Sequence, residues 1–147
     1  MNDAGTISKV VTKRRGGADV GHVIMPPGTR DIPIGDVLQM PPVPGSIKWL
    51  AIATTMAGIE VHLVSRQIGG RKDIIGAWMA YRQVLKLTHI APENMHIVEE
   101  LDWAAKAPAV MQLNPEFMID DKLEVLRAIV EYCTKHGLKI PRLYLFK

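Results

Sequence analysis

From Ser46 to the end of the chain, short apolar segments alternate with longer amphipathic ones, and this alternation constrains the fold more than any other feature. The apolar segments predict β-strands over residues 59–64, 95–98, 116–119 and 140–146. The segments between them predict helices over residues 47–57, 72–87, 103–113 and 122–136. Strands that alternate with helices in this way predict a doubly wound, Rossmann-like α/β fold, with a mostly parallel sheet and helices on both faces.

The N-terminal part of the chain is less regular. Residues 14–20 give a weak strand signal, because the segment begins charged and glycine-rich and becomes apolar only near Ala18. Residues 26–45 carry prolines at positions 26, 27, 33, 41, 42 and 44, which predicts a structured loop or flap without a regular helix or central strand. Ser46 is the predicted N-cap of the next helix, and Gly58 its predicted end. We expect a flexible arm over residues 1–12 and one domain over residues 13–147.

Composition limits the function classes. A chain of 147 residues with 48% hydrophobic and 22% charged residues is typical of one globular domain. The net charge of +3 suits phosphorylated ligands and does not exclude nucleic acid, although it is too small to indicate nucleic-acid binding. One cysteine, Cys133, permits neither an internal disulfide nor a cysteine zinc cluster. The start lacks a signal-peptide pattern, and Lys48 and Glu60 interrupt the most apolar stretch, so we expect no membrane association and a cytoplasmic location.

Polar residues gather where the predicted strands end. Ligands of open parallel sheets bind beyond the carboxyl ends of the strands. At these ends, or at the start of the helix before the fourth strand, lie Asp19, Ser65, Arg66, Lys106, Asp120 and Asp121. Paired carboxylates suit a hard cation such as Mg²⁺, while a hydroxyl and cationic side chains suit phosphate oxygens. Taken singly, each residue has a simpler interpretation: the Asp pair as a helix N-terminus, Ser65 as a turn residue, Lys106 as a surface charge.

The order of these residues resembles the haloacid dehalogenase (HAD) superfamily of phosphatases and phosphotransferases, over residues 15–146. Asp19 matches the first motif of that family, Ser65 the second, Lys106 the third and Asp120-Asp121 the fourth. Residues 23–45 are too short and too rich in proline for a folded cap domain, so the resemblance is to the minimally capped branch with an open site. The resemblance implies a phosphorylated small molecule or macromolecule as partner. Whether the chain forms a homo-oligomer is left open by the sequence.

The resemblance implies a role for each residue. Asp19 would be the nucleophile that forms an aspartyl-phosphate, and it would bind Mg²⁺ together with the Gly21 carbonyl, Asp120 and Asp121. Ser65, Arg66 and Lys106 would bind the phosphoryl group.

The chain departs from the family at one position. The family's general acid and base is a second aspartate two residues after the nucleophile, where this chain has Gly21. The neighbouring His22 could replace it, but on an extended chain an adjacent side chain points away. Three hypotheses follow: a Mg²⁺-dependent phosphohydrolase or phosphotransferase, a catalytically impaired binding or assembly module that keeps the pocket, and an interaction protein that uses the basic arm and the flap.

Overall fold

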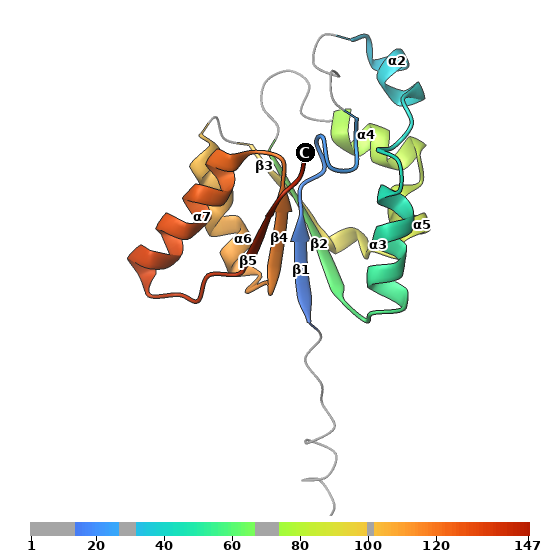
Figure 1. The fold of residues 1–147 in the computed structure, drawn as a ribbon. Coiled ribbons are helices and arrows are strands. Elements are labelled where there is room, and N and C mark those ends of the chain that lie inside the picture. Colours follow the sequence, from blue (N-terminus) through green and yellow to red (C-terminus); the bar gives the residue numbers. More distant parts are fainter. Residues whose placement is uncertain (1–13, 27–31, 67–73, 100–101) are drawn as a thin grey trace, which may run out of the picture.

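The computed structural model describes residues 14–26, 32–66, 74–99 and 102–147. In this part of the chain five parallel strands form one sheet in the order β3-β2-β1-β4-β5 (Figure 1). The strands are β1 (Arg15–Ala18), β2 (Glu60–Arg66), β3 (Met95–Val98), β4 (Phe117–Asp120) and β5 (Arg142–Leu145). The predicted fold class, a doubly wound parallel sheet, is therefore confirmed, and all five strands were placed within a few residues of their positions.

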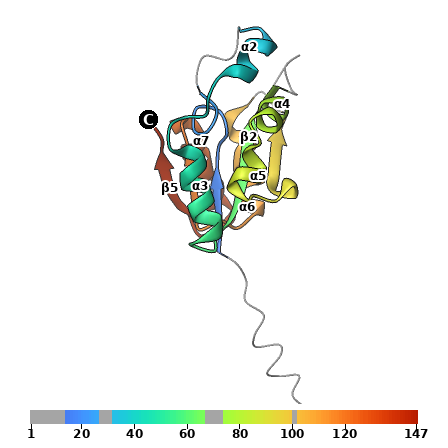
Figure 2. The ribbon, with the colours of Figure 1, turned by 90° about the vertical axis from the view of Figure 1, so that its right-hand side faces the viewer.

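Helices cover both faces of the sheet (Figures 1 and 2). One face carries α3 (Ser46–Thr55), α4 (Ile74–Tyr81) and α5 (Val84–Thr88); the other carries α6 (Lys106–Gln112) and α7 (Leu123–His136). Two short 3₁₀ turns, η2 (Pro92–Asn94) and η3 (Trp103–Ala105), precede β3 and α6. Because neighbouring side chains on a strand point to opposite faces, Leu63 of β2 packs in the core under α3–α5 and Val64 in the core under α6 and α7.

The glycines of β1 make room for side chains of β4. A Cβ atom on Gly16 would overlap the Phe117 ring, and one on Gly17 would lie 2.7 Å from the sulfur of Met118. These two glycines therefore serve the packing between two adjacent strands.

Two sequence expectations around α3 are wrong. Residues 26–45 contain a regular helix, α2 (Ile34–Gln39), which forms because Pro33 precedes it at the N-cap and the next proline comes only at Pro41. Ser46 is not the N-cap of α3: Gly45, with a left-handed φ of 81°, takes that position, and Ser46 is the first helical residue. The Ser46 hydroxyl is buried and has no hydrogen-bond partner among the described residues.

The predicted helix over residues 72–87 is two helices. Gln83 has a left-handed φ of 53° and separates α4 from α5. The side chains of Trp78 and Arg82 donate to the backbone carbonyl of Met40, 3.0 and 3.1 Å away, and so tie the end of α4 to the segment after α2. This tertiary anchor lies far away in sequence, which explains why periodicity did not reveal the break.

None of the helices in the described part of the chain is long and apolar enough to cross a membrane. The arm predicted over residues 1–12 lies outside the described residues, and the division into arm and domain stays a prediction.

Candidate active site at the switch point of the sheet

The carboxylates meet where the chain order of the strands reverses. β1 lies between β2 and β4, so the chain leaves β1 in one direction and returns on its other side. Such a switch point opens a crevice beyond the strand ends. Asp19 follows β1 directly and Asp120 ends β4, and the Asp19 amide donates to the Ile119 carbonyl at 2.8 Å. The sheet itself therefore holds the two aspartates side by side.

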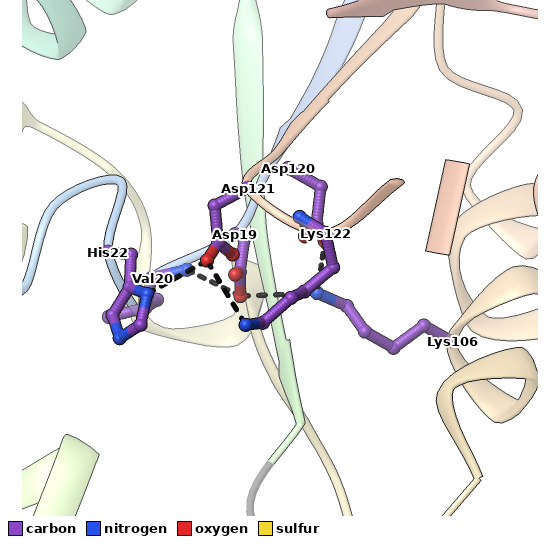
Figure 3. A network of polar contacts seen from close by, with 7 residues as sticks. All are labelled: Asp19, Val20, His22, Lys106, Asp120, Asp121 and Lys122. Carbon is purple, nitrogen blue, oxygen red and sulfur yellow. Dashed lines mark hydrogen bonds and ion pairs between the residues drawn. The ribbon is translucent and has the colours of Figure 1, made fainter. Parts of the chain in front are cut away.

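Lys106, at the start of α6, joins these two aspartates (Figure 3). Its Nζ lies 3.1 Å from Oδ1 of Asp19 and 2.6 Å from Oδ2 of Asp120. Lys106 is 1% exposed, Asp120 0% and Asp19 7%. Two backbone amides also orient these carboxylates: Val20 N donates to Asp19 Oδ1 at 2.9 Å, and Lys122 N donates to Asp120 Oδ1 at 2.9 Å. The predicted grouping of these three side chains is what the structure shows.

Asp121 forms the more accessible side of the cluster. Its Oδ2 lies 2.9 Å from Nδ1 of His22 and 3.9 Å from Nζ of Lys122 (Figure 3). His22 reaches it because its backbone is left-handed, with φ of 65°, and because its amide donates to Met25 in a tight turn. The expectation that His22 points away from the site assumed an extended chain and is wrong. No pattern in the sequence signalled this turn.

The cluster holds more negative than positive charge. Burial raises the pKa of Asp19 to about 8; Lys106 opposes this, while Asp120 and Asp121 add to it. Burial likewise raises the pKa of Asp120, again against the opposing effect of Lys106. One ammonium group thus does not compensate for the carboxylates, and an additional cation would stabilise their ionised form.

The three aspartates fit a divalent cation. One carboxylate oxygen from each of Asp19, Asp120 and Asp121 can be chosen so that all three lie within 4.8 Å of one another. Hard oxygen donors of this kind are the ligands that Mg²⁺ takes in proteins. Gly21 lies beside them, and its carbonyl as a fourth ligand stays a prediction.

β2 brings the predicted phosphate-binding residues to the same edge of the sheet. Ala18 pairs with Leu63, so Ser65 and Arg66 lie just beyond the level of Asp19 on the neighbouring strand. Ser65 is buried, and the Arg66 guanidinium lies 3.6 Å from the centroid of the Trp103 ring. Sequence reasoning did not predict this contact, because Trp103 and Arg66 lie far apart in the chain. Phosphate binding by Ser65 and Arg66 stays a prediction.

Gly21 leaves a space at the site. A Cβ atom built there meets no heavy atom within 4 Å. The position where related motifs carry an aspartate is thus open to a side chain, but the chain itself supplies none.

Comparisons with known proteins support the fold. No family model and no curated protein matches the sequence. Among solved structures, the class C acid phosphatase from Bacillus anthracis, a HAD enzyme, is similar with a TM-score of 0.58 at 12% identity. The match covers 98% of this chain and 70% of that one. The chain therefore shares the parallel α/β fold of that structure.

Two further structures have the same arrangement. The Bacillus anthracis phosphatase with tungstate bound matches with a TM-score of 0.55 at 13% identity, over 98% of this chain and 70% of that one. The DsGPDH of Dunaliella salina matches with a TM-score of 0.55 at 15% identity and covers 91% of this chain. This chain spans about a quarter of the Dunaliella protein, 24% of its length. At these identities the likeness concerns the fold.

Proposed function

We propose that the chain is a Mg²⁺-dependent, HAD-like phosphohydrolase or phosphotransferase that acts on a phosphomonoester through an aspartyl-phosphate at Asp19. The observation that carries the proposal is the buried contact of Lys106 with both Asp19 and Asp120 at the switch point of the sheet. Purely structural carboxylates are rarely buried with so little compensating charge. The fold shared with an acid phosphatase adds support.

Asp19 is arranged as a nucleophile. Val20 N and Lys106 Nζ both contact Oδ1 of Asp19, and neither of them contacts Oδ2. Attack by Oδ2 would form a bond to phosphorus while the ester P–O bond breaks, and the leaving group would depart as an alkoxide that takes a proton from water. Water would then cleave the aspartyl-phosphate, release inorganic phosphate and restore the carboxylate. Lys106 would keep Asp19 oriented and favour its ionised form.

The remaining residues would bind the substrate. Asp19, Asp120, Asp121 and the Gly21 carbonyl would hold Mg²⁺, which when bound supplies positive charge to the phosphoryl oxygens. Ser65 and Arg66 would contact the same oxygens from β2. Tungstate is a tetrahedral oxyanion like phosphate, and its presence in the Bacillus anthracis structure supports an oxyanion site here. The substrate would be a phosphorylated small molecule or macromolecule, in the cytoplasm.

Gly21 favours a second candidate function. The open space at this residue means that no side chain is available there to protonate a leaving alkoxide. General acid–base catalysis is typically worth about 10²- to 10⁴-fold in rate. A chain without it could bind a phosphorylated ligand and turn it over slowly or not at all, as a binding or assembly module.

One experiment separates the two functions. We would measure release of p-nitrophenolate, which leaves without a proton, and of an unactivated alcohol from an alkyl phosphate, both with Mg²⁺. The enzyme hypothesis predicts a burst of p-nitrophenolate that is stoichiometric with protein, and hydrolysis of the alkyl phosphate that is slower by about 10²-fold or more. Gly21→Asp should narrow this difference, because the space at Gly21 accepts the new side chain.

The controls use two carboxylate substitutions. Asp19→Asn should abolish the burst, whereas Asp36→Asn, on the exposed first turn of α2, should leave it unchanged. An Asp19→Asn variant as active as the wild type would rule out the aspartyl-phosphate. An inert wild type combined with an active Gly21→Asp variant would favour the binding module.

A further inference from the structure

The sheet has an uncovered apolar area on the face that carries α3. Figure 2 looks onto this face: α3, α4 and α5 lie in front of the sheet, and β5 lies beside α3. Among the described residues no helix covers β4 and β5 on this side, since α6 and α7 pack on the other face. Parallel strands are usually buried on both faces. This area is therefore where the fold lacks a layer.

A groove of about 720 Å³ follows the uncovered strands. Phe117 and Ile119 of β4 line it, together with Trp49 and Ile52 of α3, and residues 144–146 at the end of β5. Trp49 and Ile52 on one wall, and residues 144–146 on the other, are 36–50% exposed, while Phe117 and Ile119 between them are partly buried. A contiguous apolar surface of this kind marks an interaction site more often than free surface.

The chain also carries a helix that would fit such a groove. Trp49, Ile52 and Met56 follow one another at the i, i+3, i+7 spacing, which places them on one stripe of α3 and its C-cap. They are 44%, 43% and 80% exposed. This is the spacing by which an amphipathic helix enters an apolar groove in a partner. The stripe on α3 lies beside the groove. The same surface of the chain therefore contains both halves of a self-complementary contact.

We propose that this surface joins two copies of the chain, with the two α3 helices antiparallel about a twofold axis near Ile52. In a twofold interface the same patch meets itself, so each copy's stripe covers the groove of the other. Position 56 of one helix then faces position 48 or 49 of the other, which places the flexible Met56 side chain against Trp49 of the partner copy. Contacts between methionine sulfur and aromatic rings are favourable.

The charges of α3 agree with this orientation. The sequence of α3 contains one charged residue, Lys48, and no acidic one. With Ile52 at the axis, the two Lys48 positions are separated by eight residues along the paired helices, roughly 12 Å at the rise of an α-helix. That exceeds the Debye length of about 8 Å at physiological salt, so the two charges repel little. A parallel pair would instead place both lysines side by side.

Mass measurement of the full chain tests the proposal. Sedimentation equilibrium at about 5 to 200 µM should give twice the 16.3 kDa of one chain. Ile52→Glu and Met56→Lys should each give the monomer mass with a far-UV spectrum like that of the wild type; Met56 is so exposed that its replacement leaves the fold of one copy intact. Val130→Glu, an exposed site on α7, should remain a dimer.

Cross-linking tests the geometry. Ile52→Cys should be joined into a dimer by a short bis-maleimide, while Leu87→Cys, exposed on α5, should not. The native Cys133 is fully buried, so background reaction is low. A wild type that stays monomeric over this range overturns the proposal, even if it binds an amphiphile or another protein through the groove. A dimer that neither substitution on α3 dissociates, or that Ile52→Cys does not cross-link, overturns it as well. Both tests are independent of phosphatase activity.

Discussion

Among single residues of the site, Lys106 is the buried cation. It is buried against Asp19 and Asp120. Removing one partner of a buried ionic cluster leaves uncompensated charge and costs about 3–5 kcal/mol. We therefore expect Lys106→Met, measured without divalent cations, to lower the free energy of unfolding in urea by that amount.

The matched control removes the opposite charge as well. The double variant Lys106→Met/Asp120→Asn should regain part of the lost stability, because one carboxylate fewer is then left unpaired. If Lys106→Met lowers the free energy of unfolding by less than about 1 kcal/mol, the ion pairs of Lys106 do not stabilise the fold as their burial indicates.

Ser46 gives a prediction of the opposite sign. Its buried hydroxyl has no partner among the described residues, and a buried unsatisfied hydroxyl costs about 1–3 kcal/mol. We expect Ser46→Ala to leave the midpoint of thermal unfolding unchanged or to raise it. If Ser46 were the N-cap, Ser46→Ala would instead lower the free energy of unfolding by about 1 kcal/mol. A clear loss of stability would therefore support the N-cap assignment.

Thr54→Ala on the same helix is the control for Ser46→Ala. The Thr54 hydroxyl donates to the Ala51 carbonyl at 3.1 Å and also contacts the Thr88 carbonyl, so its removal should destabilise the protein.

The sequence predicted the charged residues of the site but not their surroundings. Asp19, Asp120 and Lys106 could be grouped because the carboxyl ends of parallel strands share one edge of the sheet. His22 could not, since its left-handed φ depends on a turn closed by Met25 and Val20. The packing role of Gly16 also depends on a ring from another strand, Phe117, which no local pattern reveals.

Between elements, a chain of polar groups connects β2 with β3. Nδ1 of His62 lies 3.0 Å from Nε2 of His96, and Nε2 of His62 lies 2.7 Å from Oε1 of Glu60. Arg15 of β1 donates to the same Glu60 oxygen at 3.1 Å. At 3.0 Å the two imidazoles share one proton, because a second proton between them would bring two N–H groups together.

Stability should therefore depend on pH through His96. Burial, and secondarily the charge of His62, lowers the pKa of His96 from its ordinary value of 6.5. The unfolded chain then takes up a proton more readily than the folded one, so this contribution is complete above pH 6.5 and declines as the pH falls below it. The raised pKa values of Asp19 and Asp120 act in the opposite direction, but they are common to the wild type and to His96→Gln. We therefore expect the change from pH 7.5 to pH 5.5 to move the urea midpoint of the wild type downward relative to that of His96→Gln.

The chosen pH range keeps Glu60 out of this comparison. Hydrogen bonding to His62 lowers the pKa of Glu60 from 4.5, so its contribution is lost only as the pH falls below that value. If the urea midpoint changed equally between pH 7.5 and pH 5.5 in the wild type and in His96→Gln, His96 would not be the cause of the pH dependence.

Element boundaries were predictable where the cause is local. Gly137, with φ of 65°, ends α7 at the predicted position, since a glycine there can take the left-handed conformation. The break between α4 and α5 was missed because Arg82 and Trp78 bind a carbonyl some forty residues earlier in the chain. α2 was missed because proline content was applied to a whole segment, whereas only the positions of Pro33 and Pro41 decide where a helix fits.

For the whole molecule, the strand order determines both the candidate site and the proposed interface. The reversal between β1 and β4 brings Asp19 next to Asp120, and the two helices after β3, α6 and α7, pack on one face only. The other face of β4 and β5 is therefore left to Phe117, Ile119 and the α3 groove. The alternation of strands and helices predicted the parallel sheet; it did not predict which strands stay uncovered, because that depends on the side to which each helix crosses.

The last prediction concerns the response of the whole fold to a divalent cation. A ligand that binds only the folded state stabilises it by RT ln(1 + [L]/Kd), about 2.7 kcal/mol at a concentration of 100 Kd. For a chain of 147 residues this corresponds to a rise in Tm of roughly 5–11 °C. We expect such a rise by calorimetry as MgCl₂ replaces NaCl at constant ionic strength, because Asp19, Asp120 and Asp121 share a charge that Lys106 does not balance.

Asp121→Asn is the matched variant for this measurement. Asp121 forms ion pairs with His22 and Lys122, whereas Lys106 pairs with Asp19 and Asp120, so replacing Asp121 removes a cation ligand while leaving the buried Lys106 contacts in place. The variant should keep its Tm in NaCl and lose most of the response to Mg²⁺. An equal rise in Tm in both proteins would locate the cation elsewhere. A wild-type Tm that stays constant up to about 100-fold above a typical millimolar concentration of Mg²⁺ would mean that the three carboxylates hold no metal, because binding to the folded state must raise Tm.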